Sequence, residues 1–172
     1  MKDLKIELTK NPKAKPAKGA KLGFGSVFTD HMLLMEYDRG IGWHDARIVP
    51  FGPISLSPAS TVLHYAQETF EGMKAYRSQD GRVLLFRPEE NFKRLNRSNE
   101  RLCIPALDVD FCVESLKELV MLDKVWIPRP RARPCISAPS SSATSPSSAS
   151  RKRTATSTAC CSAPAALITR AA

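Results

Sequence analysis

The sequence predicts an α+β domain followed by a disordered C-terminal tail. Short apolar runs bounded by turn residues fill the chain up to residue 87, and two amphipathic segments follow them. Strands followed by helices are typical of an antiparallel sheet with helices packed against it. After Trp126 and Ile127 large apolar residues become rare, so the remaining chain cannot bury enough surface to offset its conformational entropy.

Three strands are predicted before residue 58. The apolar run 30–37 ends at Asp38-Arg-Gly and predicts the first strand. Gly40 and Gly42 indicate a turn, and residues 46–51, which end at Gly52-Pro53, predict the second strand. Residues 54–57 predict a short third strand before Pro58.

A helix and a hairpin are expected next. Residues 59–70 predict a short helix, because their apolar side chains fall at helical spacing. The Asp80-Gly81 pair lies between two strand-like runs, 71–77 and 82–87. Because glycine adopts positive φ without steric penalty, this pair predicts a tight hairpin turn.

Two helices complete the predicted domain. Pro88 at a first helical position, with Glu89 and Glu90 near the positive end of the dipole, predicts where the first helix begins. Pro105 ends it, and Asp108 or Asp110 caps the second. The apolar stripe is Phe92, Leu95 and Leu102 in the first helix, and Val113, Leu116, Leu119 and Val120 in the second.

Charge and composition divide the chain near Pro130. The net charge is +9 and the pI is about 9.6, which favours a nucleic-acid partner when taken alone. However, the segment 131–172 is rich in Ser and Ala and contains basic residues but no Asp or Glu. We therefore expect a flexible lead-in at 1–21, a folded domain at 22–130 and a disordered basic tail at 131–172.

Several classes of protein are disfavoured. No apolar run is long enough for a transmembrane helix, and the N-terminus lacks the apolar segment of a signal peptide. The five cysteines have neither zinc-site nor disulfide spacing, so a reducing, cytoplasmic location is expected. His31, His44 and His64 lie at no metal-ligand spacing, so no metal site is predicted.

Residue types alone predict no chemistry. The chain lacks a glycine-rich phosphate loop, and Gly23 and Gly25 do not make one. By pattern, Tyr65 and Phe70 are core residues and Arg94 is a surface arginine.

Six motifs, however, stand in one order. They are Phe24-Gly-Ser-Val-Phe-Thr-Asp-His-Met, Leu63-His-Tyr, Phe70-Glu-Gly-Met-Lys-Ala-Tyr, Phe86-Arg-Pro, Asn91-Phe-Lys-Arg-Leu and Arg101-Leu-Cys-Ile-Pro. In this order and spacing the chain closely resembles the N-terminal small domain of branched-chain amino acid aminotransferases. Those enzymes belong to the class-IV, fold-type-IV group that uses pyridoxal 5′-phosphate. The resemblance spans residues 22–128.

The resemblance implies a transamination. The amino group of leucine, isoleucine or valine passes by way of pyridoxal phosphate to 2-oxoglutarate, which gives a branched 2-oxo acid and glutamate. It also implies a second, larger domain, with the cofactor between the two domains, and assembly of the intact enzyme as a homodimer or larger oligomer. No nucleic-acid or membrane partner is implied.

Four residues match binding positions of that family. Phe24, Tyr65 and Phe70 correspond to pocket residues that hold the branched side chain, and aromatic walls favour apolar over charged substrates. Arg94 corresponds to the arginine that binds the cofactor phosphate, for which a guanidinium offers a bidentate fork.

The catalytic group of the family has no counterpart here. The lysine that forms the Schiff base lies in the large domain, beyond the matching part, and Lys74 is not at its position. No catalytic residue is therefore assigned in this chain, and we expect the truncated polypeptide to be inactive alone.

The tail is explained by a shift of reading frame. Family members continue with a stretch resembling Glu-Gly-Thr-Ser-Leu-Tyr-Ile-Arg-Pro-Phe-Ile-Ile-Gly-Asn-Glu-Pro-Phe-Leu-Gly-Val. Written in GC-rich codons and read one nucleotide late, that continuation yields the sequence from Arg131 to Ser150. The hypothesis is a frameshift near Pro130.

Two alternatives remain. One is another class-IV enzyme, such as a D-amino-acid transaminase or aminodeoxychorismate lyase, although the motifs around Tyr65 and Phe70 favour branched substrates. The other is a non-catalytic module whose basic tail binds nucleic acid. The tail has few cations and no aromatic residue to stack on bases, which weakens that interpretation.

Overall fold

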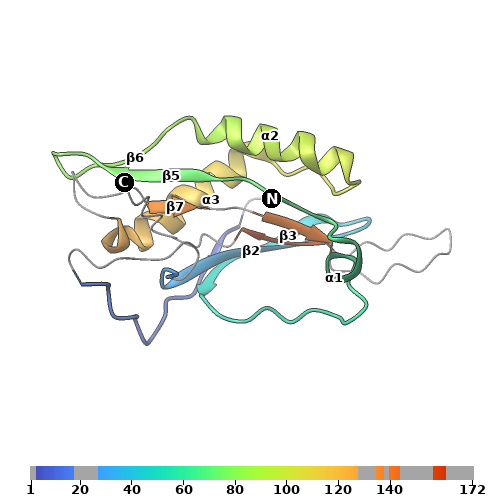
Figure 1. Ribbon diagram of the computed structural model, residues 1–172, viewed down its shortest axis with the longest axis horizontal. Helices are drawn as coiled ribbons and strands as arrows, with labels where there is room; N and C mark the ends of the chain where they lie inside the picture. Colours follow the sequence, from blue (N-terminus) through green and yellow to red (C-terminus); the bar gives the residue numbers. More distant parts are fainter. Residues whose placement is uncertain (1–2, 18–26, 128–134, 138–139, 144–156, 162–172) are drawn as a thin grey trace, which may run out of the picture.

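The computed structural model describes residues 3–17, 27–127, 135–137, 140–143 and 157–161. Its strands form two sheets, with the orders β1-β3-β2-β9-β8-β4 and β6-β5-β7 (Figure 1). The strands are β1 Lys5–Ile6, β2 His31–Asp38, β3 Gly42–Pro50, β4 Glu68–Phe70, β5 Met73–Arg77, β6 Val83–Leu85, β7 Cys135–Ser137, β8 Ser140–Ala143 and β9 Ser157–Cys161. The helices are α1 Thr61–Tyr65, α2 Pro88–Arg101, α3 Val109–Leu122 and a 3-10 helix, Lys124–Trp126. All strand pairs except β1 with β3 are antiparallel, so the α+β prediction is confirmed.

Both predicted turns form. Gly40, between β2 and β3, and Gly42, the first residue of β3, take φ of 96° and 87°, and Gly81 takes φ of 88° between β5 and β6. These values lie in the left-handed region that glycine enters without a Cβ clash. The Asp80 carboxylate accepts the backbone N–H of Arg82 at 3.2 Å, which fixes the second turn.

Two predictions between residues 54 and 70 are wrong. Residues 54–57 form no strand, and Ile54 and Leu56 are exposed between prolines. The predicted helix over 59–70 is only α1, because Ala66 adopts φ of 47° in the left-handed region and ends it. The chain then continues as β4, so Tyr65 and Phe70 lie on different elements.

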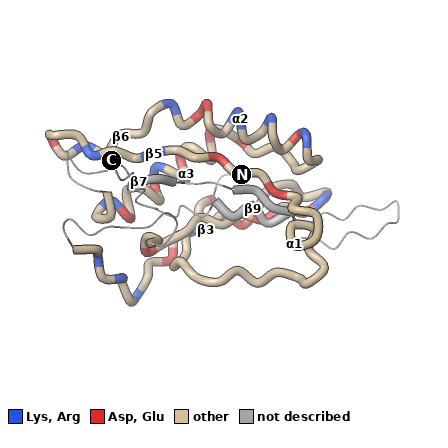
Figure 2. The backbone as a smooth tube through the Cα atoms, in the orientation of Figure 1, with Lys and Arg blue, Asp and Glu red and all other residues tan. Residues whose placement is uncertain are grey.

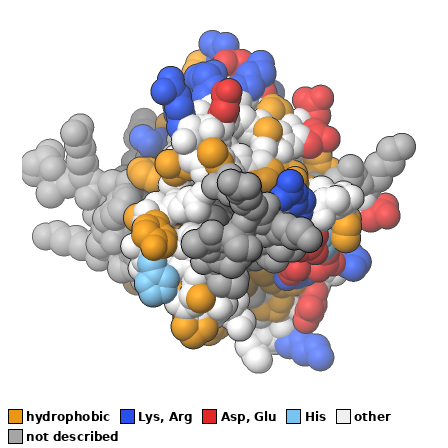
Figure 3. Space-filling view, turned by 90° about the vertical axis from the view of Figure 1, so that its right-hand side faces the viewer, with side chains coloured by type: hydrophobic (Ala, Val, Ile, Leu, Met, Phe, Trp, Pro, Cys, Tyr) orange, Lys and Arg blue, Asp and Glu red, His pale blue; other side chains and the backbone are white. Residues whose placement is uncertain are grey.

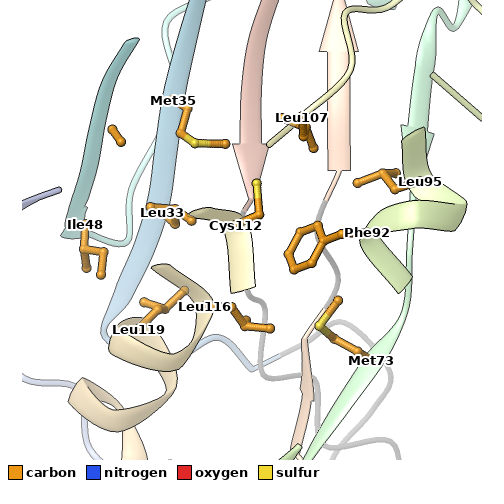
Figure 4. Close-up of a cluster of buried hydrophobic side chains, with 11 residues drawn as sticks. Leu33, Met35, Ile48, Met73, Phe92, Leu95, Leu107, Cys112, Leu116 and Leu119 are labelled. Atoms are coloured by element: carbon orange, nitrogen blue, oxygen red, sulfur yellow. The ribbon is translucent and has the colours of Figure 1, made fainter. Parts of the chain in front are cut away.

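The core lies between β2, β3 and the two long helices. Phe92 and Leu95 of α2 meet Leu116 and Leu119 of α3, and these pack against the buried side chains of β2 and β3 (Figure 4). The Asp108 side chain caps α3 by accepting the Phe111 N–H at 3.1 Å, as predicted. Leu102 is the exception to the predicted stripe, because it follows the last turn of α2 and is partly exposed.

The N-terminal segment is attached rather than free over its described part. β1 pairs with β3, and the Thr9 N–H donates to His31 Nε2 at 3.0 Å. Lys13 and Lys15 bind Asp30 and stack over the rings of Phe51 and Trp126. The prediction of a flexible lead-in is wrong for residues 3–17, because polar and cation–π contacts hold them where the sequence shows no apolar periodicity. Residues 18–21 lie outside the described residues.

Three short segments of the tail pair through their backbones. β7 pairs with β5, β8 with β4, and β9 with both β2 and β8. These segments are the parts of the predicted tail that the structure describes, and they lie where open strand edges offer unpaired N–H and C=O groups to an extended chain. The rest of 131–172 lies outside the described residues. No helix in the described part has the length and apolar character needed to cross a membrane.

Candidate functional site

The candidate site lies where β4 and β5 meet α2. Glu71 stands between these strands with only 8% of its surface exposed. Its Oε1 and Oε2 accept hydrogen bonds from Arg94 Nε and Nη2, both at 2.6 Å. Oε2 also accepts from Asn91 Nδ2 at 2.9 Å. A buried carboxylate is thus held by two side chains from one face of α2.

The opposite charges of Glu71 and Arg94 each stabilise the ionised form of the other. Burial raises the pKa of Glu71, but hydrogen bonds from Arg94 and Asn91 and the positive charge of Arg94 outweigh burial and hold that pKa below its ordinary value. Glu71 in turn raises the pKa of Arg94, mainly through its hydrogen bonds. Both groups are therefore ionised at neutral pH, as in a charge-assisted bidentate pair.

Arg94 keeps donors that Glu71 does not use. A guanidinium carries five N–H donors, and the bonds to Glu71 use one on Nε and one on Nη2. The Arg94 side chain is 56% exposed, and no other partner is found for it in the described part of the chain. Basic positions recur along α2 in Figure 2, and basic side chains gather at the top of Figure 3, over the same helix. The arrangement can bind an anion.

The predicted aromatic residues lie nearby in the chain but are not enclosed. Phe70 immediately precedes Glu71 and is 77% exposed at the end of β4, and Tyr65 is 75% exposed at the end of α1. In the described residues, neither ring stacks with or makes an edge contact to another aromatic ring. Phe24 lies outside the described residues. The structure brings Arg94 to Glu71, beside Phe70 in the chain, whereas the described residues leave Tyr65 and Phe70 exposed.

A second polar cluster ties β2 to the end of α3. His31 Nδ1 lies 2.7 Å from Asp123 Oδ1, and the His31 backbone N–H donates to Asp123 Oδ2 at 3.0 Å. Asp30 accepts from Lys15 and from Trp126 Nε1, at 2.7 and 2.9 Å. Desolvation raises the pKa of Asp30, but these bonds and that of the Lys13 N–H hold it below its ordinary value. Each of these side chains is bonded to another group of the chain, which indicates a structural role.

Glu71 is the residue that sequence reasoning missed. It stands inside the quoted motif, yet no role was assigned to it. The signal that could have pointed to Glu71 is its position as an acidic residue between two strand-like runs. A carboxylate buried at such a position requires a cationic partner. Its partner is 23 positions away, which no local pattern reveals. Within the described ranges, no group of three or more His, Cys, Asp or Glu side chains is placed to hold a metal ion.

The chain is closely similar to curated branched-chain aminotransferases. It is 54% identical over 125 residues to branched-chain-amino-acid aminotransferase 2 of Bacillus subtilis, and 52% identical over 128 residues to transaminase 1 of that organism. A Mycobacterium tuberculosis branched-chain-amino-acid aminotransferase is 52% identical over 106 residues. The first two matches cover 73% and 74% of this chain but 34% and 36% of the relatives, so the chain spans about a third of their length. No protein-family model matches the chain.

Solved structures agree on the fold. The Thermoproteus uzoniensis branched-chain aminotransferase with norvaline has a TM-score of 0.54 at 18% identity, over 76% of this chain and 40% of that one. The T.th. branched-chain amino acid aminotransferase complexed with N-(5′-phosphopyridoxyl)-L-glutamate has a TM-score of 0.50 at 23% identity, over 73% and 39%. Over its matched residues, the chain is homologous to the N-terminal part of the branched-chain aminotransferases, as its motifs predicted.

Proposed function

We propose that residues 22–130 are the small domain of a pyridoxal-phosphate-dependent branched-chain aminotransferase. The intact enzyme transfers the amino group of leucine, isoleucine or valine to 2-oxoglutarate, with release of the branched 2-oxo acid and glutamate. The observation that carries this proposal is 54% identity over 125 residues to a relative of that name. A homodimer is the expected assembly of the intact enzyme.

Arg94 is the proposed phosphate-binding residue of this domain. The cofactor, when bound, supplies an electron sink for the reacting amino acid. Arg94 anchors its phosphate end through the donors that Glu71 leaves open, and a planar fork fits two phosphate oxygens better than an ammonium does. Arg94 fits only the phosphate end of the cofactor. The catalytic lysine is expected in the family's large domain.

Phe24, Tyr65 and Phe70 are the proposed walls of the substrate side-chain pocket. The exposure of Tyr65 and Phe70 supports this role, since rings that are 75% and 77% exposed here can be covered by a second domain or by substrate. Burial of a branched side chain against such rings contributes about 1.5–3 kcal/mol. Rings also exclude water from the apolar part of the substrate, which makes burial of a charged side chain costly.

The segment 131–172 is proposed to be the product of a shifted reading frame. Its Ser/Ala composition and lack of acidic residues differ from the preceding domain. Read one nucleotide earlier, its codons would continue the aminotransferase sequence. The 172-residue polypeptide is expected to be inactive alone, because it spans about a third of the length of its relatives and the catalytic lysine is expected in the family's large domain.

The test begins with the coding DNA. The other frame beyond codon 130 should encode a Ser/Thr-Leu-Tyr-Ile-Arg-Pro stretch. The product of a gene restored to that frame should transaminate leucine with 2-oxoglutarate, whereas the 172-residue chain should not. Lack of that stretch would refute the frameshift. Turnover by the 172-residue chain would refute its inactivity, and a restored enzyme that uses only D-amino acids would refute the substrate class.

A further inference from the structure

The geometry of the Glu71–Arg94 pair determines which edge of the guanidinium is available to bind an anion. Glu71 takes the side edge of the guanidinium, formed by Nε and Nη2, at 2.6 Å to each nitrogen. Among the described residues, no partner is found for the end edge, which is formed by Nη1 and the second N–H of Nη2. These two edges of a planar fork point in different directions. A carboxylate on one edge therefore leaves a bidentate site on the other.

Resting on the proposed phosphate role of Arg94, we infer that Glu71 is a positioning residue that fixes the guanidinium with its end edge directed at the phosphate. Glu71 does not touch the phosphate. It acts through Arg94, and Asn91 holds Glu71 in turn by donating to Oε2 at 2.9 Å and to the Gly72 carbonyl at 3.1 Å. The Gly72 carbonyl thus holds the Asn91 amide, the amide holds the Glu71 carboxylate, and the carboxylate holds the Arg94 guanidinium.

The burial of the two partners supports this role. Glu71 is 8% exposed, whereas the Arg94 side chain is 56% exposed. A long, exposed arginine side chain samples many rotamers and loses that freedom when it binds. A rigid buried carboxylate removes much of this freedom before the anion arrives, which is how preorganisation raises affinity.

A competing effect has the opposite sign. The negative charge of Glu71 repels a phosphate, so a Glu71 without a positioning role would weaken binding and its neutralisation would strengthen it. The lowered pKa of Glu71 keeps that charge present at neutral pH. The sign of the change on neutralisation therefore distinguishes positioning from simple charge.

The experiment uses the full 172-residue chain with isotope-labelled arginine. The probes are inorganic phosphate and 4-deoxypyridoxine 5′-phosphate, which lacks an aldehyde and cannot react with lysines. 4-Deoxypyridoxine without phosphate is the matched ligand control. The Arg94 Nε–H signal in nuclear magnetic resonance spectra reports binding. Glu71→Gln is expected to weaken phosphate binding about tenfold, the loss of about 1.4 kcal/mol of preorganisation.

A double-mutant cycle separates positioning from a merely structural effect. Arg94→Lys keeps the charge but not the fork, and it should also weaken binding. In the Arg94→Lys background, Glu71→Gln should have little further effect, because its action passes through the guanidinium. If Glu71→Gln does not fold, Asn91→Ala replaces it and should weaken binding to a smaller extent.

The outcomes divide clearly. If phosphate moves the Arg94 signal equally in wild type and Glu71→Gln, or binds the variant more tightly, the positioning role is refuted while the phosphate role of Arg94 stands. An Asn91→Ala variant with wild-type affinity refutes it likewise. If no phosphate probe moves the Arg94 signal in the wild-type chain, the proposed role of Arg94 fails, and the positioning role fails with it.

Discussion

Two carboxylates in this molecule are almost equally buried, yet their surroundings differ. Asp30 is 7% exposed and Glu71 is 8% exposed. Asp30 binds Lys15, whose ammonium also lies 4.2 Å from the centre of the Trp126 ring and whose side chain is 35% exposed. Glu71 binds Arg94, whose side chain is 56% exposed and keeps unused donors. Burial of the acid thus does not distinguish the two sites, whereas the exposure of its cation and the donors left on that cation do.

The largest expected effect is the loss of Asp30. Asp30→Ala removes the acceptor of Lys15, Lys13 N–H and Trp126 Nε1, and it leaves the buried indole N–H unpaired. We expect the free energy of unfolding to fall by about 2–4 kcal/mol, measured by urea denaturation. Glu114→Ala, which breaks the exposed pair with Lys117 on α3, is the control and should change stability little. Equal losses in the two variants would contradict a structural role for Asp30.

Removal of Glu71 should destabilise the fold less. Glu71→Ala frees Arg94, which water can solvate because of its exposure, and leaves Asn91 bonded to the Gly72 carbonyl. The expected loss is about 1–2 kcal/mol by the same urea assay. A loss as large as that of Asp30→Ala would erase the difference between the two sites.

Acid should reduce stability through both carboxylates. Their folded-state pKa values are below the ordinary values, so each contributes stability that is fully present above the unfolded pKa, roughly pH 4, and is lost as pH falls through the folded pKa. The unfolding free energy should therefore be flat near neutrality and fall below about pH 4. Asp30→Asn and Glu71→Gln should each make that fall less steep, as thermal melts across pH will show. An unchanged slope in both variants would exclude them as its source.

The smallest expected effect is that of replacing Lys15, whose ammonium lies over the Trp126 ring. Lys15→Met keeps an apolar stem beside Trp126 but removes both the cation–π contact and the ion pair with Asp30, which keeps its bonds from the Lys13 N–H and Trp126 Nε1. We expect a loss of about 0.5–1 kcal/mol in urea denaturation, the usual size of a partly exposed cation–π contact or ion pair. Lys10→Met, in the same segment, is the control. If the urea midpoint of Lys15→Met equals that of the wild type, the contacts of Lys15 do not hold the N-terminal segment.

Local chemistry in the sequence predicted the elements with strong start and turn signals. Pro88 with two acids begins α2, Asp108 caps α3, and Gly81 turns the hairpin, because each depends on neighbours within a few positions. The prediction of a helix over 59–70 was wrong because Ala66, which is not a glycine, takes a left-handed conformation that no residue preference indicates.

Contacts between distant positions were not predictable in this way. Lys15 meets Asp30 and Trp126, and Glu71 meets Arg94, only after the sheet and helices have packed. Of the candidate site, family motifs predicted Arg94, Tyr65 and Phe70 as binding residues, and their roles stay predictions. Neither periodicity nor composition pointed to Glu71, because its partner lies on a different element.

The most direct test compares the two cations in one sample. In the 172-residue chain labelled on arginine and lysine side chains, inorganic phosphate is added while the signals of Arg94 and Lys15 are followed. We expect a saturable shift of the Arg94 signal and none beyond the general salt effect for Lys15. Glu71 uses two of the five N–H donors of Arg94, whereas Lys15 already donates to Asp30 and to the Lys13 carbonyl and lies over the Trp126 ring. Equal responses of the two cations, or a response of Lys15 alone, would contradict this difference between the two sites.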